Sequence, residues 1–483
     1  MYKKIISLSI LMVALIGLTL NNADASWSSN TSNVNTVNTS NVVKASASFA
    51  PIGIQVVNVG AGADILNDVS LTLTGASSFD PTTDIASLTS DSSTSGVGIY
   101  LDNTPVGTFG AEDQPFAMNP GPSYIGSGPW TITISPNANI ASGTTKNYLI
   151  VLRTASGATN GHQVRVGLAS VTYATAGTKA DLAVNAPGNS TYITIDTSAP
   201  TVSSRVTQDI DGDGLIDAIK VTMSESILDS TLTSGNFAVA GYTVASISGT
   251  ANSSTANDEI FYLTLTEGAG TCSSSDSTGC DTDALPNVTY TAGTLTDHAG
   301  TSLANTGAVA ATDGSAPIAK YSKYKDTDND GRVDRVDVTF SENIVSDGYN
   351  GADYAASTAG TINLSTDSAV ATSGDDLRIT ILGDAGKTGG ATNPQVTYTN
   401  NFVNTSRGLN DSSNNAVATV TIAASDSASP VIKTVTIEDT NSNGLIDKLT
   451  YTWTENVDTD DSAAPVSADV PTTLLPDGQT ATY

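Results

Sequence analysis

The chain has 483 residues and a formal net charge of −29, from 19 basic and 48 acidic side chains. Aspartate supplies 41 of the acidic residues and glutamate only seven, and aspartate favours turns and loop ligand positions over helices. So acidic a chain lacks the basic surface that nucleic-acid binding requires, and its length predicts several domains.

The first 25 residues have the features of a secretory signal peptide. Lys3 and Lys4 precede an apolar run over 5–20, and the sequence ADA at 23–25 supplies a small-x-small cleavage site. The alternative is an N-terminal membrane anchor, but the run is short for a spanning helix, and no other stretch approaches the length required. We therefore expect residues 1–25 to be removed and the mature protein to be secreted, at the cell surface or extracellular, without a membrane span.

Two segments follow with different compositions. Residues 26–48 are mainly Ser, Asn and Thr, which predicts a flexible linker. From 49 to 198, short segments alternate apolar and polar residues, as in VSLTLT at 69–74 and WTITIS at 130–135. Clusters of Gly, Asn, Asp and Pro separate these segments, and no sustained helical period appears. We expect one β-sandwich domain over 49–198.

A long internal repeat begins after this domain. An Ala-Pro or Ser-Pro step recurs at spacings of 117 and 113 residues, at Pro200, Pro317 and Pro430. The last aspartates of three acidic loops keep the same two spacings, at Asp217, Asp334 and Asp447. A constant phase between two landmarks indicates a true repeat, and such a period fits a self-sufficient domain.

Each acidic loop leads into a strand pattern with an apolar face. The residues predicted to point inward are Ile219, Val221 and Met223 in the first copy, Val336, Val338 and Phe340 in the second, and Leu449, Tyr451 and Trp453 in the third. A glutamate ends each strand, at Glu225, Glu342 and Glu455. These glutamates could close a metal site from elsewhere, but we expect them to fix the strand end or a neighbouring loop.

The repeats predict an all-β fold of tandem immunoglobulin-like β-sandwich domains. We place them at 199–315 and 316–428, with a truncated third copy at 429–483. Only 54 residues follow Ser429, which provide too few strands to close a sandwich. We expect the sequence to be a fragment, and completion by another chain is the alternative.

The three acidic loops are DIDGDGLID at 209–217, DTDNDGRVD at 326–334 and DTNSNGLID at 439–447. Carboxylates about 5 Å apart repel by roughly 3 kcal/mol at an effective dielectric of about 20, so a cation or water must separate them. Oxygen ligands at positions 1, 3 and 5 with Gly at position 6 are typical of a loop that wraps around Ca²⁺. The alternatives are an Asp/Gly-rich turn without an ion, or Mg²⁺, which demands stricter geometry.

We therefore predict one Ca²⁺ site in each loop. The candidate ligands are Asp209, Asp211, Asp213, Asp217 and the carbonyl of Leu215 in the first loop; Asp326, Asp328, Asp330, Asp334 and the carbonyl of Arg332 in the second; and Asp439, Asn441, Asn443 and Asp447 in the third. The third has two fewer carboxylates and should bind more weakly. The twelfth position, a bidentate Glu in an EF-hand, is Lys220, Asp337 and Thr450 here.

The stretches DGDGLIDAIKVTMSESI and DNDGRVDRVDVTFSENI, each preceded by SAP, and the later LTDHAG resemble bacterial Ig-like repeats of surface-layer and other cell-surface proteins. The resemblance covers 199–483 well and 49–198 only in general character. It implies tandem rigid β-domains, calcium at the acidic loop, and an architectural or adhesive role. Met223 and Trp453 stand where the TFSE motif has Phe.

Few residues of catalytic type occur in the chain. Cys272 and Cys280 predict one local disulfide in an exported protein, with a metal or redox role as the weaker alternative. The only histidines, His162 and His298, lie in no nucleophile-like or zinc-binding motif. The acidic residues cluster in repeated loops, whereas an active site would be unique to one copy. We therefore expect no enzyme activity.

Two functions fit these features. The first is a structural surface protein whose domains are stiffened by calcium, with other copies of itself or cell-envelope polymers as partners. Because each acidic loop follows an interdomain proline in the sequence, its ion could set the angle between successive domains. The alternative is an adhesin, or the accessory carbohydrate-binding region of a larger secreted enzyme, with surface polysaccharide as the partner.

Overall fold

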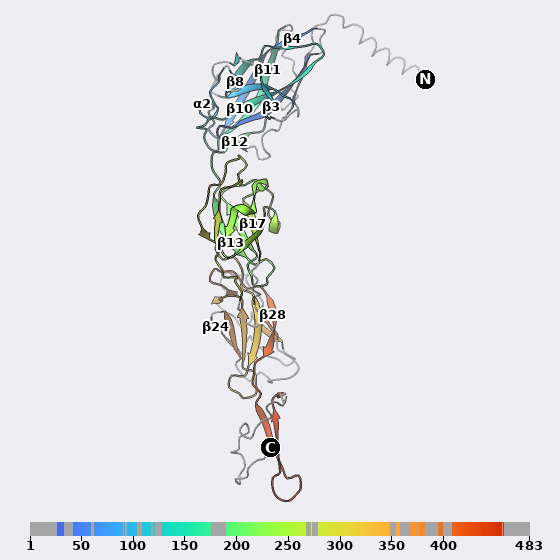
Figure 1. Ribbon diagram of the computed structural model, residues 1–483, viewed down its shortest axis with the longest axis vertical. Coiled ribbons are helices and arrows are strands. Elements are labelled where there is room, and N and C mark those ends of the chain that lie inside the picture. Colours follow the sequence, from blue (N-terminus) through green and yellow to red (C-terminus); the bar gives the residue numbers. More distant parts are fainter. Residues whose placement is uncertain are drawn as a thin grey trace, which may run out of the picture.

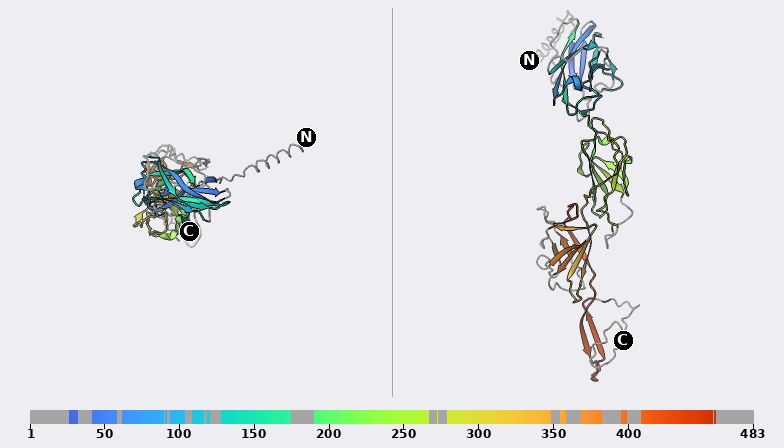
Figure 2. Two further views of the ribbon diagram at one scale, coloured as in Figure 1. Left: turned by 90° about the horizontal axis from the view of Figure 1, so that it is seen from above. Right: turned by 90° about the vertical axis from the view of Figure 1, so that its left-hand side faces the viewer.

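The computed structural model describes residues 27–32, 42–58, 62–89, 91, 94–103, 109–116, 119–120, 128–174, 190–266, 272, 279–347, 354–357, 368–373, 375–381, 395–398, 408–455 and 457. Regular structure in these ranges is almost entirely β-strand. The strands form separate sheets in four successive segments of the chain, and Figures 1 and 2 show these segments following one another along the long axis. The predicted all-β class of tandem sandwich domains is confirmed. The predicted signal peptide lies outside the described residues.

The first segment is a sandwich of two sheets that share one core. One sheet has the order β1 (Trp27–Ser32), β3 (Ser48–Asn58), β10 (Thr145–Arg153), β5 (Val97–Leu101) and β6 (Gln114–Pro115). The other has the order β2 (Val42–Val43), β12 (Ile193–Ile195), β11 (Gln163–Tyr173), β4 (Asp64–Ala76), β8 (Trp130–Ser135) and β7 (Asn119–Pro120), with β9 (Ala138–Ile140) also paired to β4. Alternating residues of β3 and β4, such as Ile54 and Leu71, are buried in the same cluster. Their period of two is what the sequence predicted.

The segment expected to be a linker, 26–48, contains two strands of this sandwich. Trp27–Ser32 pairs antiparallel with β3 along all six residues, and Val42–Val43 pairs in parallel with β12. Val43 is also buried in the core. The linker prediction is therefore wrong at these positions. Strand pairing uses backbone groups, so a Ser/Asn/Thr-rich segment can add to an open sheet edge without a strong side-chain signal.

The first repeat also consists of two sheets. The larger has the order β13 (Val202–Gln208), β14 (Ala218–Met223), β17 (Ile260–Thr266) and β16 (Thr243–Ser248), and the smaller β15 (Phe237–Val239), β18 (Asn287–Tyr290) and β19 (Val309–Ala310). Short 3-10 turns occur at η1 (Asp229–Thr231), η2 (Ser234–Asn236) and η3 (Ala251–Ser253). The predicted inward residues Ile219, Val221 and Met223 are all buried in its core.

The strands of the second repeat join into one larger sheet and a separate pair. Its larger sheet has the order β23 (Tyr354–Ser357), β26 (Gln395–Tyr398), β28 (Val420–Asp426), β20 (Ala319–Lys325), β21 (Arg335–Phe340), β25 (Asp376–Ile381) and β24 (Ser368–Ser373), and β22 (Val345–Asp347) pairs with β27 (Gly408–Asn410). The predicted inward residues Val336, Val338 and Phe340 are buried here as well.

In the third copy the described residues form one hairpin, β29 (Ile432–Glu438) and β30 (Lys448–Trp453). The predicted inward set is only partly covered, since Leu449 and Tyr451 are half-buried and Trp453 is 37% exposed. The prediction that this face is buried is therefore wrong for the hairpin as described. A single hairpin has no second sheet to cover its apolar face.

Candidate metal centres

Each acidic loop is the hairpin turn that joins the first two strands of its copy: β13 to β14, β20 to β21, and β29 to β30. Positions 4 and 6 of every loop have positive φ, with values of 77° and 98° at Gly212 and Gly214, 60° and 89° at Asn329 and Gly331, and 57° and 83° at Ser442 and Gly444. Glycine adopts this left-handed conformation without strain. The three loops therefore follow the same path although position 4 differs in each.

The first and last aspartates of each loop accept hydrogen bonds from its backbone. Asp209 accepts from the amides of Gly212 and Gly214 at 2.7 and 2.9 Å, and Asp217 accepts from Ile210 at 3.0 Å. Equivalent bonds connect Gly331 to Asp326, Thr327 to Asp334, Gly444 to Asp439 and Thr440 to Asp447. These amide donors hold two carboxyl groups on the inside of the turn.

The structure brings three of the four predicted side-chain ligands together in the first two loops. One oxygen from each of Asp209, Asp211 and Asp217 lies within 4.8 Å of the other two, and the same holds for Asp326, Asp328 and Asp334. Oδ1 of Asp217 is buried and has no hydrogen-bond partner. Burial raises the pKa of Asp209 and of Asp217, and repulsion by neighbouring loop carboxylates adds to both shifts. Each group of three could hold a metal ion.

Position 5 is not part of these groups. Oδ1 of Asp213 accepts a hydrogen bond from the amide of Leu215 at 2.9 Å, and neither Asp213 nor Asp330 joins the groups of three. In the third loop, Asn443 makes the bond equivalent to that of Asp213, to Leu445 at 2.8 Å. Asn441 accepts from the amide of Asn443 at 3.0 Å. The third loop thus keeps the shape of the others with fewer carboxylates.

The first two acidic loops lie against the following domain and away from the proline linker that precedes them. Nζ of Lys320, at the start of the second repeat, donates to the carbonyl of Asp213 in the first loop. A Cβ added at Gly331 in the second loop would lie 2.7 Å from Cγ2 of Thr454 in the third copy. The seven residues of β13, at about 3.3 Å each, carry the chain to the opposite end of its domain. These two loops therefore lie at the boundary with the domain that follows in the chain.

Two further groups of acidic residues lie at the boundaries between domains, and we call them the junction clusters. One contains Asp196, Glu225 and Asp297, and the other Asp313, Glu342 and Asp411; in each, one oxygen per residue lies within 4.8 Å of the others. From the sequence, we expected these glutamates to fix a strand end or a neighbouring loop, with closure of a metal site as the alternative. A signal was present, because Asp196, Asp313 and Asp426 each precede the repeat proline by four residues.

The junction clusters bring carboxyl groups together in partly buried surroundings. Burial raises the pKa of Glu225 to about 7, and the Asp196 and Asp297 carboxylates add to the rise. Burial raises the pKa of Glu342 to about 8 against the opposing effect of a hydrogen bond from Thr282, with repulsion by Asp313 and Asp411 as a further cause. A nearby positive charge would stabilise the ionised form of these groups.

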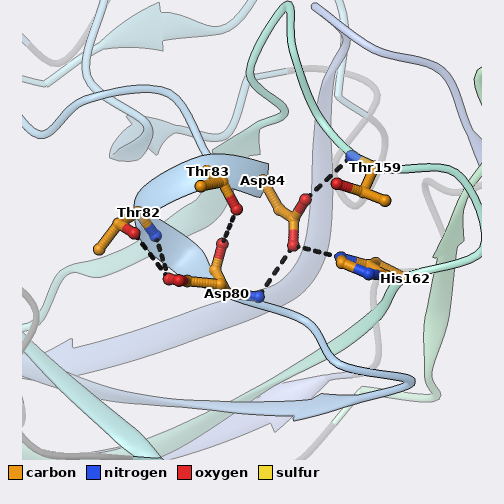
Figure 3. Close-up of polar contacts among 6 residues, drawn as sticks. All are labelled: Asp80, Thr82, Thr83, Asp84, Thr159 and His162. Atoms are coloured by element: carbon orange, nitrogen blue, oxygen red, sulfur yellow. Dashed lines mark hydrogen bonds and ion pairs between the residues drawn. The ribbon is translucent and has the colours of Figure 1, made fainter.

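A different polar group in the N-terminal domain has a structural role (Figure 3). Asp84 ends the short helix α2 (Pro81–Asp84) and is fully buried. Its carboxylate accepts from the amide of Asp80 and the amide of Thr159, both at 2.9 Å, and contacts Nδ1 of His162 at 2.7 Å. Asp80 caps the start of α2 through the amide of Thr82. These bonds fasten α2 to the loop that carries His162.

The predicted disulfide between Cys272 and Cys280 is confirmed. It lies beside the first acidic loop, since a Cβ added at Gly214 would come within 2.6 Å of Sγ of Cys272. Among the described residues, no helix has the length and apolar character needed to cross a membrane.

Comparisons with known proteins place the chain in no family. No family model matches the sequence, and no curated protein is similar to it. The resemblance to bacterial Ig-like surface repeats therefore stays a prediction at the level of the family.

Solved structures with partial similarity include multidomain and surface proteins. The I9–I11 tandem of titin is 7% identical, with 80% of this chain and 96% of that one covered and a TM-score of 0.17. The BSP domain of a biofilm-associated protein is 10% identical, with 86% and 70% covered and a TM-score of 0.24. Domains 4–9 of the surface layer protein SbsC are 13% identical, with 59% and 38% covered and a TM-score of 0.13. The chain spans 27% of the length of a family 123 glycoside hydrolase from Clostridium perfringens that it also matches.

Proposed function

We propose that the protein is a secreted, non-catalytic structural protein of the cell surface, in which Ca²⁺ bound at the acidic loops stiffens a chain of Ig-like domains. The observation that carries this proposal is the grouping of carboxylates from positions 1, 3 and 9 in two loops that both have positive φ at positions 4 and 6. Ca²⁺ accepts such oxygen ligands in flexible geometry, whereas Mg²⁺ requires a near-ideal octahedron.

Secretion is supported by the sequence at 1–25 and by the disulfide, because disulfides persist in oxidising compartments. A non-catalytic role is supported by the repetition of the acidic groups from one repeat to the next. We propose other copies of the protein or cell-envelope polymers as partners, since a chain of rigid domains presents the same kind of surface along its length.

The direct test is thermal unfolding of the mature protein in CaCl₂ and in EDTA. A ligand that binds only the folded state stabilises it by about 2.7 kcal/mol at a concentration of 100 Kd. We expect the melting temperature to rise with CaCl₂ concentration and the rise to be reversed by EDTA. MgCl₂ at the same concentration is the control for ionic strength and for the choice of ion. Identical melting curves in CaCl₂ and EDTA would contradict the proposal.

A further inference from the structure

The two junction clusters each combine carboxylates from two domains. Asp313 follows the last strand of the first repeat. The residues before and after it are fixed to that repeat by hydrogen bonds. The amide of Thr312 donates to the carbonyl of Arg205 at 2.8 Å, and the amide of Gly314 donates to Oγ1 of Thr207 at 3.2 Å. Its two partners, Glu342 and Asp411, belong to the second repeat. The oxygens that meet within 4.8 Å therefore come from both sides of the boundary.

The boundary between the N-terminal domain and the first repeat has the same construction. Asp196 directly follows β12, and its amide donates to the carbonyl of Val43 at 2.8 Å. Its partners Glu225 and Asp297 belong to the first repeat. At the next boundary, Asp426 ends β28 of the second repeat and Glu455 follows β30 of the third copy, in the equivalent positions. The pKa of Glu455 is raised by burial and by the adjacent Asp426.

A second and independent observation is a set of buried oxygens without partners. Oδ2 of Asp297 and Oε1 of Glu342 are buried and accept no hydrogen bond, and their residues are only 1% and 5% exposed. Oε1 of Glu455 also has no partner, although the residue as a whole is half-buried. Leaving such an acceptor unsatisfied destabilises the folded protein, and more so when the acceptor is charged. Oε1 of Glu342 and Oε1 of Glu455 occupy equivalent positions in successive repeats, and orphan oxygens that recur at the boundaries indicate a missing partner.

No basic side chain in the described part of the chain forms an ion pair with a junction cluster. The ion pairs among the described residues use Asp84, Asp337 and Glu438, and no cluster carboxylate. Ca²⁺ binds carboxylate oxygens at 2.3–2.6 Å. Oxygens within 4.8 Å of one another can therefore contact one such ion without a change in the backbone. A carboxylate set without nitrogen or sulfur donors selects a hard cation.

We propose that each junction cluster binds a divalent cation, with Ca²⁺ the best fit, and that this ion fixes the orientation of one domain against the next. The ligands are one aspartate from the end of the upstream domain and one glutamate and one aspartate from the downstream domain. These sites are separate from the acidic loops and bind an ion whether or not the loops do.

The number of ions bound tests the sites. Ca²⁺ is titrated calorimetrically into the full-length mature protein after EDTA has been dialysed away. Glu342→Gln preserves the shape of the side chain and should abolish one site or weaken it at least tenfold. Glu259→Gln removes an equal charge from an exposed position in the first repeat and should leave the titration unchanged. Asp313→Asn, on the other side of the boundary, should remove the same site as Glu342→Gln.

Asp313→Asn also keeps the proposal testable if Glu342→Gln does not fold. If Glu342→Gln fails to fold, as judged by circular dichroism and melting in EDTA, Asp313→Asn decides the outcome, because Asp313 is only half-buried. Asp328→Asn in the acidic loop should leave the junction site intact, so that failure of the loop sites and failure of the junction sites are distinguishable. Unchanged stoichiometry and affinity in folded Asp313→Asn would overturn the proposal.

Domain orientation is measured by small-angle X-ray scattering of the same proteins. In CaCl₂, Asp313→Asn should show a broader distribution of interatomic distances than the wild-type protein, close to that of wild type in EDTA. Glu259→Gln should match wild type in both conditions. Loss of the junction ion without any change in the scattering would show that the ion does not set the orientation, and would overturn that part of the proposal.

Discussion

The hydroxyl groups of Thr282 and Ser341 lie 2.8 Å apart and share a buried hydrogen bond across the boundary between the two repeats. Thr282 also donates to the carboxylate of Glu342, and Oγ of Ser341 accepts from the amide of Ile318 at 3.0 Å. The boundary is thus a packed polar contact with both domains contributing, which is the setting that a junction ion would stabilise further.

Removing this contact should lower stability by a modest and specific amount. Thr282→Val keeps the side-chain shape and deletes the hydroxyl, with an expected cost of about 1 kcal/mol. Ser341→Ala should cost a similar amount, and the two effects should add only in part, because the variants share one bond while each also loses a bond of its own. Denaturant unfolding of the two single variants and the double variant measures this coupling. Fully additive losses would show that the hydroxyls act independently.

The third acidic loop shows which substitution could remove one charge from each of the other two loops while keeping the turn. Asp211→Asn and Asp328→Asn place the residue found at Asn441 into the same turn, where its oxygen can still accept from the amide two residues on, as Asn441 does at 3.0 Å. Each substitution removes one charge without removing the backbone hydrogen bond. We expect calcium affinity of the altered loop to fall about tenfold, equivalent to about 1.4 kcal/mol.

Asp213→Asn serves as the matched control for this experiment. Asp213 lies in the same loop but outside the carboxylate group, so its substitution should weaken calcium binding less than Asp211→Asn. The competing result, equal losses at both positions, would indicate that position 5 also ligates the ion, as the sequence pattern predicted. Calcium titration of the three variants separates the two outcomes.

Glycine at position 6 of the acidic loops has two different surroundings. A Cβ at Gly444 would meet nothing within 4 Å, whereas one at Gly331 would clash with Thr454 of the following copy. Gly444→Ala should therefore cost only the left-handed backbone penalty, about 1–2 kcal/mol. Gly331→Ala should cost more and should also alter small-angle scattering.

Gly62→Ala, at a position with ordinary φ and open space, controls for the change in chain entropy. Equal effects of the first two variants would argue against contact between the second loop and the third copy.

Asp337 provides a pH-dependent contribution to the stability of the second repeat. Although burial opposes ionisation, hydrogen bonds and charge from Arg335 and Lys325 outweigh it and hold the pKa of Asp337 below its usual value. A carboxyl group with a lowered folded-state pKa stabilises the fold above its unfolded pKa, and this stabilisation is lost as pH falls through the folded pKa.

Asp337→Asn should lower stability at neutral pH by about 2–3 kcal/mol, less than for a fully buried ion pair because both cations are partly exposed. The difference between wild type and variant should shrink below about pH 4, as Asp337 becomes protonated in both states. Melting temperatures of both proteins from pH 2.5 to 7 measure this difference. Because wild type and variant share all the other carboxylates, subtracting one from the other removes their contribution. A constant difference across that range would contradict the assignment.

Much of this architecture follows from local sequence patterns. The two-residue alternation at Ile219, Val221 and Met223 and at Val336, Val338 and Phe340 identified strands and their buried faces, because side chains on a strand alternate sides. The recurring Gly at position 6 identified the left-handed turns, and the spacing of Cys272 and Cys280 identified the disulfide. All of these depend on residues within a few positions of one another.

The tertiary structure decided which strands pair, which domain each loop contacts and which carboxylates meet. Trp27–Ser32 became an edge strand because its backbone pairs with β3, a partner that no local pattern names. The length of β13 placed the first acidic loop beside the next domain instead of its own linker. The meeting of Asp313, Glu342 and Asp411 joins residues from two domains. Local periodicity determined the strands, whereas only the packing of complete sheets end to end could determine which carboxylates share a site.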